Sequence, residues 1–271
     1  MKTETLPLWK NGAPRQIPGG EVPSITPYRA ENKTHDGTVV IFPGGAYACR
    51  APHEGDGYAR FFNEHGYDVF VVDYRVSPNR FPTELLDARR AVRLVREHAA
   101  EYGISPDKIA VMGSSAGGHL AALVSTYRPA IDGEGADATD EISPFPNASI
   151  LCYPVIDTSD DAVVHYGSKI NLLGEENEDL GASVSPSVIA DRHTCPAFLW
   201  HTSDDECVNV INSYRYATRL RNVGVPVEMH ILPHGPHGMG LAERRYGYTD
   251  DTPYVARWGE WLLSWLASLG F

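Results

Sequence analysis

The sequence predicts an α/β fold in which a mostly parallel central sheet is covered by helices on both faces. Six apolar runs rich in β-branched residues predict strands buried on both faces, and amphipathic helical patterns lie between them. Strands that alternate with such helices are typical of a parallel sheet with right-handed crossovers. The predicted strands span Thr38–Phe42, Val69–Asp73, Lys108–Gly113, Ser149–Val155, Ala197–Thr202 and Val227–Leu232.

The clearest helical patterns space their apolar residues at intervals of three and four. Residues 1–36 contain several Pro and Gly and predict short antiparallel edge strands instead. The two helical patterns consist of Leu85, Ala88, Val92, Val95 and Ala99, and of Val255, Trp258, Leu262, Trp265 and Leu269.

A chain of 271 residues suits one substantial core, and we predict a single domain over residues 1–271. Two stretches break the alternation of strands and helices. Residues 128–145 are acidic and contain Gly and Pro, and residues 159–192 are polar and rich in Ser. We expect both to be loop or cap insertions near the functional site. That site should lie beyond the carboxyl ends of the parallel strands.

The composition argues against several classes of partner. The balance of 23 basic and 35 acidic residues gives a net charge of −12, which repels the phosphates of nucleic acids. No apolar stretch approaches the roughly 18 residues that cross a bilayer, so we expect no membrane partner. The first residues lack the apolar run of a secretory signal, which predicts a cytoplasmic location unless a signal peptide has been removed. The four cysteines show no disulfide or zinc spacing, and nothing indicates the oligomeric state.

A candidate nucleophile lies between a predicted strand and a predicted helix. Gly113-Ser114-Ser115-Ala116-Gly117 fits the pattern G-x-S-x-G and leads into a helix-favouring stretch. In this setting a sharp turn exposes the oxygen of Ser115, and small neighbours let the helix approach the strand. The alternative is a glycine-rich turn without function.

A serine hydroxyl is a poor nucleophile at neutral pH, so Ser115 would need a base and an acid that orients this base. Asp204 and Asp205 follow the predicted strand Ala197–Thr202, and either is a candidate acid. Composition does not separate the two, and one of them could merely cap the helix expected near Asn209.

Two histidines after the last predicted strand are candidate bases. His234 and His237 lie in a loop with Gly and Pro, which can hold a histidine in a tight turn. Their spacing also fits a metal pair, but no matching third ligand is evident, and we expect no metal site. His201 lies inside a predicted strand, and we expect it to be a hydrogen-bonded core histidine.

Acyl transfer also needs donors for the negative charge that develops on the carbonyl oxygen. Pro43-Gly44-Gly45-Ala46-Tyr47 directly follows the strand Thr38–Phe42, and its glycines allow backbone N–H groups to face a substrate. The N–H group of Ala116 would complete the hole.

On these motifs the sequence resembles the α/β-hydrolase family of small bacterial acetyl esterases and carbohydrate esterases, including acetyl xylan esterase-like and feruloyl esterase-like members. The likeness runs from about Thr38 to the C-terminus. It is carried by Pro43-Gly44-Gly45-Ala46-Tyr47, His53-Glu54-Gly55, Val72-Asp73-Tyr74-Arg75-Val76, Gly113-Ser114-Ser115-Ala116-Gly117-Gly118-His119, Ser185-Pro186, Phe198-Leu199-Trp200-His201-Thr202, Asp205-Glu206-Cys207-Val208 and Gly235-Pro236-His237-Gly238.

The resemblance implies a catalytic role for three residues. It assigns Ser115 as nucleophile, His237 as base and Asp205 as the acid that orients His237. The acid of this family usually stands three residues before a valine, and Asp205 stands so before Val208.

The resemblance also implies that the N–H groups of Gly45, Ala46 and Ala116 form the oxyanion hole. Many related enzymes have His at the position of Pro43 and a third Gly at that of Ala46. Tyr47 and Glu54 are candidate substrate-binding residues, although a core-facing tyrosine and a helix-start carboxylate explain them equally well.

Together these features predict a serine esterase that forms an acyl-enzyme and needs no cofactor. The resemblance implies short acyl groups, acetyl above all, on a small-molecule or oligosaccharide ester. The alternatives are a feruloyl esterase or a peptidase or amidase on the same scaffold, and a non-catalytic binding protein that keeps the fold.

Overall fold

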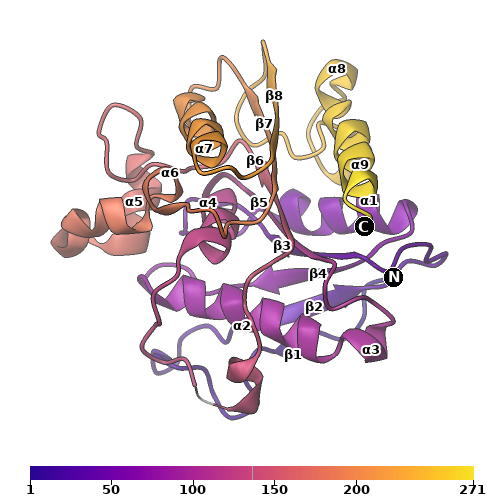
Figure 1. Ribbon diagram of the computed structural model, residues 1–271, viewed down its shortest axis with the longest axis vertical. Helices are drawn as coiled ribbons and strands as arrows, with labels where there is room; N and C mark the ends of the chain where they lie inside the picture. The colour runs from indigo at the N-terminus through magenta and orange to yellow at the C-terminus, as the bar shows by residue number, and fades with distance from the viewer. Residues whose placement is uncertain (136) are drawn as a thin grey trace.

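An eight-stranded sheet runs through the centre of the computed structural model, which describes residues 1–135 and 137–271 (Figure 1). The strand order is β1-β2-β4-β3-β5-β6-β7-β8. Strands β3 to β8 are parallel, and β2 pairs antiparallel with both β1 and β4. The predicted α/β architecture, with antiparallel edge strands from residues 1–36, is therefore confirmed.

Each of the six predicted runs contains a strand. The largest difference is at β6, which ends at Cys152 although the apolar pattern continues to Val155. Tyr153 has a φ of 35° and is followed by Pro154, so the chain turns out of the sheet there. The strands are β1 (Leu6–Pro7), β2 (Ser24–Tyr28), β3 (Thr38–Phe42), β4 (Asp68–Asp73), β5 (Ile109–Ser114), β6 (Ala148–Cys152), β7 (Ala197–Thr202) and β8 (Val227–Leu232).

Both helical patterns are present, each divided by a short break. The first is interrupted at His98, whose φ of −94° and ψ of 14° are not helical, and the second at Arg257. The α-helices are α1 (Tyr58–Glu64), α2 (Thr83–Glu97), α3 (Ala99–Tyr102), α4 (Ser115–Thr126), α5 (Tyr166–Leu173), α6 (Pro186–Ile189), α7 (Ile211–Asn222), α8 (Pro253–Ala256) and α9 (Trp258–Ser268). A π-helical turn η1 (His53–Gly57) and the 3-10 helices η2 (Ala138–Glu141), η3 (Glu175–Val184) and η4 (Arg244–Tyr246) complete them. None of the described helices is long and apolar enough to cross a bilayer.

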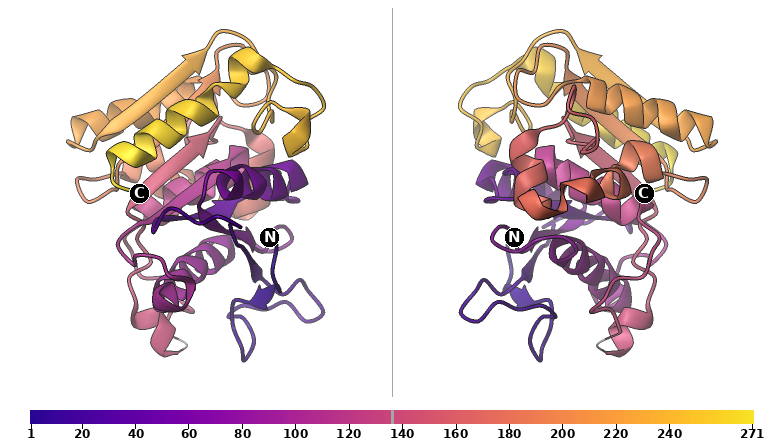
Figure 2. Two further views of the ribbon diagram at one scale, coloured as in Figure 1. Left: turned by 90° about the vertical axis from the view of Figure 1, so that its right-hand side faces the viewer. Right: turned by 90° about the vertical axis from the view of Figure 1, so that its left-hand side faces the viewer.

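Helices cover both faces of the sheet (Figure 2), and the core has two halves, one on each face. Side chains alternate across a strand, so Val40 and Phe42 of β3 pack on the face covered by α2, α4 and α7. Val39 and Ile41 pack on the opposite face, beneath α1 and α9. Burial on both faces explains why the strands appear in the sequence as continuous apolar runs.

The two stretches expected near the site connect to opposite ends of the strands. Residues 128–145, of which residue 136 lies outside the described residues, join the end of α4 to the start of β6. They lead to Asn147, whose N–H donates to Ile109 O at the beginning of β5. This segment therefore begins and ends near the amino ends of the strands, whereas we expected it beside the site at their carboxyl ends. Residues 159–192 follow β6 and carry α5, η3 and α6, so they begin at the carboxyl ends.

A buried carboxyl group lies in the first turn of α2. Glu84 is fully buried, and neither of its oxygens has a hydrogen-bond partner among the described residues. Burial raises the pKa of Glu84 to about 8, and the charge of Asp87 adds to the effect. The folded protein therefore binds a proton that the unfolded chain releases above its ordinary pKa of 4.5.

We expect Glu84→Gln to remove a pH-dependent loss of stability. Because the folded-state pKa is raised, the stabilisation is fully present below about pH 4.5 and is lost as the pH rises towards 8. The free energy of unfolding of variant and wild type is measured by urea denaturation at pH 5 and at pH 8. The variant should gain stability relative to the wild type between these two pH values, by on the order of 1–3 kcal/mol. An equal difference at both pH values would contradict this assignment.

Candidate active site

The strand β5 passes directly into α4 through a turn that holds Ser115 at its sharpest point. Ser115 has a φ of 53°, a conformation that L-residues rarely adopt. A Cβ on Gly113 would lie 2.0 Å from Gly117 O, and one on Gly117 would lie 2.0 Å from Phe42 O. The two glycines of the motif are therefore required because helix and strands leave no space for a side chain.

A chain of hydrogen bonds joins the three residues that the motifs single out. The Nε2 atom of His237 lies 2.9 Å from Ser115 Oγ, and its Nδ1 atom lies 2.7 Å from Asp205 Oδ2. The three residues follow β5, β7 and β8 and meet at the carboxyl ends of these strands. Asp205 accepts a hydrogen on Nδ1, which leaves Nε2 free to accept the proton of Ser115. Ser115 is 7% exposed, so it is mostly but not completely buried.

The neighbouring aspartate and histidine form a separate pair. Asp204 accepts hydrogen bonds from His234 Nδ1 and from the N–H group of Gly235, both at 2.9 Å. The side chain of His234 is 83% exposed. Asp204 therefore supports the start of the histidine loop, and the structure brings Asp205 rather than Asp204 to His237.

The carboxylate of Asp205 is held from several sides. Its Oδ1 atom accepts the N–H groups of Cys207 and Val208, each at 2.9 Å, and Nε2 of His201 lies 3.2 Å from its Oδ2. Burial alone would raise the pKa of Asp205, but hydrogen bonds from His201 and His237 outweigh it and lower the pKa well below its usual range. Asp205 is thus an ionised partner for His237 at neutral pH.

His201 is the buried, hydrogen-bonded histidine that its place in β7 suggested. Besides Asp205, it contacts Val208 O at 3.0 Å through Nε2 and Ser213 Oγ at 2.8 Å through Nδ1. Since both neighbours of Nε2 accept, Nε2 carries the hydrogen. The contact with Asp205 was not expected from the sequence, because alternation along a strand does not reveal what a buried residue touches.

The loop after β3 presents backbone N–H groups beside Ser115. Gly45 has a φ of 138° and Ala46 a φ of 54°, and the described residues contain no acceptor for either N–H group. Ala116 lies in the first turn of α4, where N–H groups have no partner within the helix. A Cβ on Gly44 would lie 2.6 Å from Ser114 O, so this loop rests directly on the turn that carries Ser115.

Tyr47 is a buried support of this loop. It is fully buried, and its hydroxyl lies 2.8 Å from Nδ1 of His119, whose Nε2 lies 2.8 Å from Val184 O. Since a carbonyl can only accept, Nε2 carries the hydrogen and Tyr47 donates to Nδ1. Burial lowers the pKa of His119 to about 4, so this histidine stays neutral. As a substrate-binding residue Tyr47 remains a prediction that its burial does not favour.

Glu54 links the oxyanion loop to the histidine loop. It is 2% exposed, and its Oε2 accepts the N–H group of Gly44 at 2.7 Å. Its Oε1 accepts the hydroxyl of Tyr153 at 2.6 Å, and that hydroxyl in turn accepts the N–H group of Gly240 at 2.8 Å. The ring of Tyr153 also lies 5.0 Å from that of His237. These contacts favour a positioning role for Glu54 over contact with a substrate.

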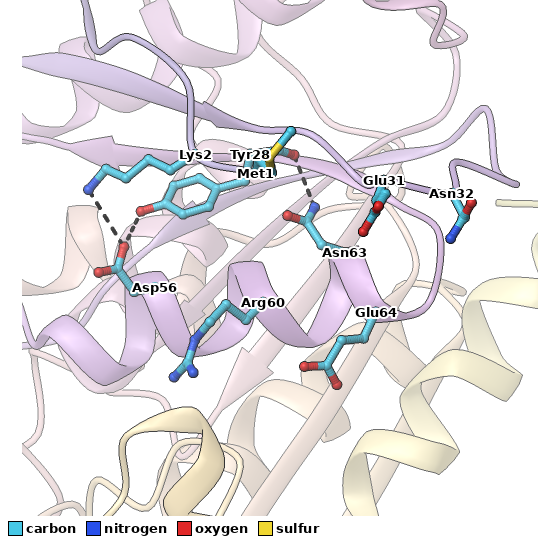
Figure 3. A pocket seen from close by; sticks show the side chains of 9 residues that line it. All are labelled: Met1, Lys2, Tyr28, Glu31, Asn32, Asp56, Arg60, Asn63 and Glu64. Carbon is cyan, nitrogen blue, oxygen red and sulfur yellow. Dashed lines mark hydrogen bonds and ion pairs between the residues drawn. The ribbon is translucent and has the colours of Figure 1, made fainter.

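A cavity of about 570 Å³ lies elsewhere, between β2 and α1 (Figure 3). Asp56 accepts the hydroxyl of Tyr28 at one end of it, and Lys2 lies 3.8 Å from the same carboxylate. None of its lining residues belongs to the chain of hydrogen bonds at Ser115, and β2 is separated from β5 by two strands. The described part of the chain contains no cluster of His, Cys, Asp and Glu that could hold a metal ion.

The chain matches one family model and is similar to several proteins of known activity. The BD-FAE family model matches residues 26–220. An acetylxylan esterase of Xylanibacter ruminicola is 33% identical over 83% of this chain and 45% of its own length, and endo-1,4-beta-xylanase B of Butyrivibrio fibrisolvens is 32% identical over 84% and 36%. The chain thus spans less than half the length of these two curated relatives.

A solved structure matches nearly the whole chain. The acetyl ester-xyloside bifunctional hydrolase of Caldicellulosiruptor lactoaceticus is 41% identical, with a TM-score of 0.90 over 99% of this chain and 97% of that one. The match includes the segments that carry Ser115, Asp205 and His237.

We expect Tyr153→Phe to slow hydrolysis of p-nitrophenyl acetate. The change keeps the ring beside His237 and removes the hydroxyl that joins Glu54 to Gly240, so both loops lose a fixed position. Steady-state kinetics should show kcat lowered about tenfold, and the free energy of unfolding should fall by on the order of 1–2 kcal/mol.

Tyr216→Phe is the matched control. The Tyr216 hydroxyl is buried without a hydrogen-bond partner among the described residues, so its removal should leave kcat unchanged and should not destabilise the protein. An unchanged kcat in Tyr153→Phe would show that the link between the two loops is not needed.

Proposed function

The chain belongs to the BD-FAE family and has the α/β-hydrolase fold, and on this premise we propose that it is a serine carboxylic-ester hydrolase. Its substrates are short acyl esters, acetyl above all, of carbohydrates or similar alcohols. The observation that carries the proposal is the continuous hydrogen-bond chain from Asp205 through His237 to Ser115. It lies beside a loop with two N–H groups that have no acceptor among the described residues.

In the first half of the reaction Ser115 Oγ attacks the ester carbonyl carbon while His237 Nε2 takes its proton. The charge that develops on the carbonyl oxygen is stabilised by the N–H groups of Gly45, Ala46 and Ala116, each worth about 3–4 kcal/mol at such a site. Asp205 stabilises the imidazolium. The bond to the alcohol then breaks, and His237 gives the proton to the leaving oxygen.

In the second half a water molecule attacks the acyl-enzyme. His237 removes a proton from this water, and the same N–H groups stabilise the second oxyanion. Collapse of this intermediate releases the acid and returns the proton to Ser115 Oγ. Apart from this water, no step requires a group beyond the side chains and N–H groups named here.

One observation supports an acetylated carbohydrate as the substrate. The relatives that match most of this chain include proteins named for acetylxylan and for an acetyl ester and xyloside.

The decisive variant is Ser115→Ala. Removal of the nucleophile should reduce the hydrolysis of p-nitrophenyl acetate at least about a thousandfold, because the remaining groups have no covalent route. Ser114→Ala is the control, since the hydroxyl of Ser114 contacts Tyr58 at 2.7 Å instead of His237. Its removal should lower the rate of hydrolysis less than about tenfold.

Acetate release from acetylated xylo-oligosaccharides, compared with hydrolysis of methyl ferulate, then tests the substrate class. Release of acetate with little ferulate formed supports the proposal. Activity that survives in Ser115→Ala would exclude this nucleophile, and preference for the ferulate would exclude the acetyl assignment.

A further inference from the structure

Helix α5 lies across the candidate site from the acid loop to the oxyanion loop. At its C-terminal part, Asn171 Nδ2 donates to Ala46 O at 2.9 Å. At its N-terminus, His165 Nε2 lies 3.6 Å from the sulfur of Cys207, two residues after Asp205. The segment 159–192 thus contacts both loops that flank Ser115. A helix of eight residues is about 12 Å long, and α5 bridges this distance between the two loops.

The side chain of His165 has a fixed orientation. It caps α5, because its Nδ1 atom accepts the N–H group of Ser168 at 3.2 Å and lies 2.8 Å from Ser168 Oγ. With Nδ1 used as an acceptor, the hydrogen of the neutral ring is on Nε2. The sulfur of Cys207 is only a weak acceptor. Within residues 1–135 and 137–271, this Nε2–H group therefore has no strong partner at the partly exposed edge of the site.

His165 lies close enough to His237 and Asp205 to feel their charges. Burial lowers the pKa of His165, a positive charge on His237 lowers it further, and the charge of Asp205 opposes both effects. When His237 takes the proton of Ser115, His165 therefore stays neutral. It cannot compete with His237 as a base, but it keeps a hydrogen-bond donor.

The chemistry of the reaction tells which part of a substrate His165 would meet. His237 returns its proton to the leaving oxygen, so the alcohol part of the ester lies beside His237. The acyl carbonyl lies at Gly45 and Ala46. A donor that contacts the acid loop at Cys207 and feels the charge of His237 therefore lies on the side of the alcohol.

We propose that His165 is a specificity-determining residue, whose Nε2–H group binds a hydroxyl or ring oxygen of the sugar from which the acyl group is removed. This inference rests on the proposed esterase function and deepens it. The segment 159–192 then selects the alcohol, while the loop after β3 accommodates the acyl group.

The test compares two acetyl esters that differ only in the alcohol. In His165→Asn the asparagine can still cap α5, but its side chain is too short to reach the position of Nε2. The kcat/KM for acetylated xylotriose should fall about fivefold, mainly through KM, which corresponds to the loss of one neutral hydrogen bond. The kcat/KM for phenyl acetate should change by less than about twofold.

His193→Asn is the matched control. His193 is exposed and precedes β7, so it lies at the amino ends of the strands, away from the site. This variant should hydrolyse both esters like the wild type. The thermal midpoint of both variants should stay within about 2 °C of the wild type.

The outcomes separate the inference from the function on which it rests. Equal losses on both esters, or no loss on either, would overturn the role of His165 while leaving the esterase intact. A wild-type protein that hydrolyses neither ester would overturn the proposed function, and the inference with it.

Discussion

The backbone of the turn at Ser115 lies so close to β3 that no side chain fits between them. A Cβ on Gly117 would meet the carbonyl oxygen of Phe42 at 2.0 Å, and one on Gly44 would meet that of Ser114 at 2.6 Å. This close approach fixes three parts of the site at once. It holds Ser115 in its unusual backbone conformation, it aims the first turn of α4 at the site, and it places the oxyanion loop against the nucleophile. The remaining polar groups are arranged around this contact.

Hydrogen bonds made within the folded protein then set the chemical state of each group. Asp205 is held by two backbone N–H groups and by His201, so its position does not depend on His237. The bond from His237 to Asp205 selects the form of the ring that can accept a proton from Ser115. Because Asp205 and His237 are held in place before a substrate arrives, the site needs little reorganisation when charge develops during the reaction. Glu54 and Tyr153 extend the same principle by joining the two loops that must act together.

Much of the fold was predictable, because strands buried on both faces leave continuous apolar runs in the sequence. The end of β6 was not, since periodicity does not reveal the turn at Tyr153. The residues of the hydrogen-bond chain could be identified from the sequence because each lies in a short motif that directly follows a predicted strand. The contact between Tyr153 and Gly240 joins positions 87 residues apart, and no local pattern indicates it. The same holds for His165, whose relation to the acid loop depends on how an irregular segment folds back onto the sheet.

The central claim is that Ser115 Oγ is made nucleophilic by His237. The most direct measurement is peptide mapping by mass spectrometry after brief exposure to an organophosphorus ester, for the wild type and for His237→Ala. The account predicts one adduct per chain, located on Ser115, that forms at least about a hundredfold more slowly in the variant. An adduct on another residue, or labelling at an equal rate without His237, would contradict it.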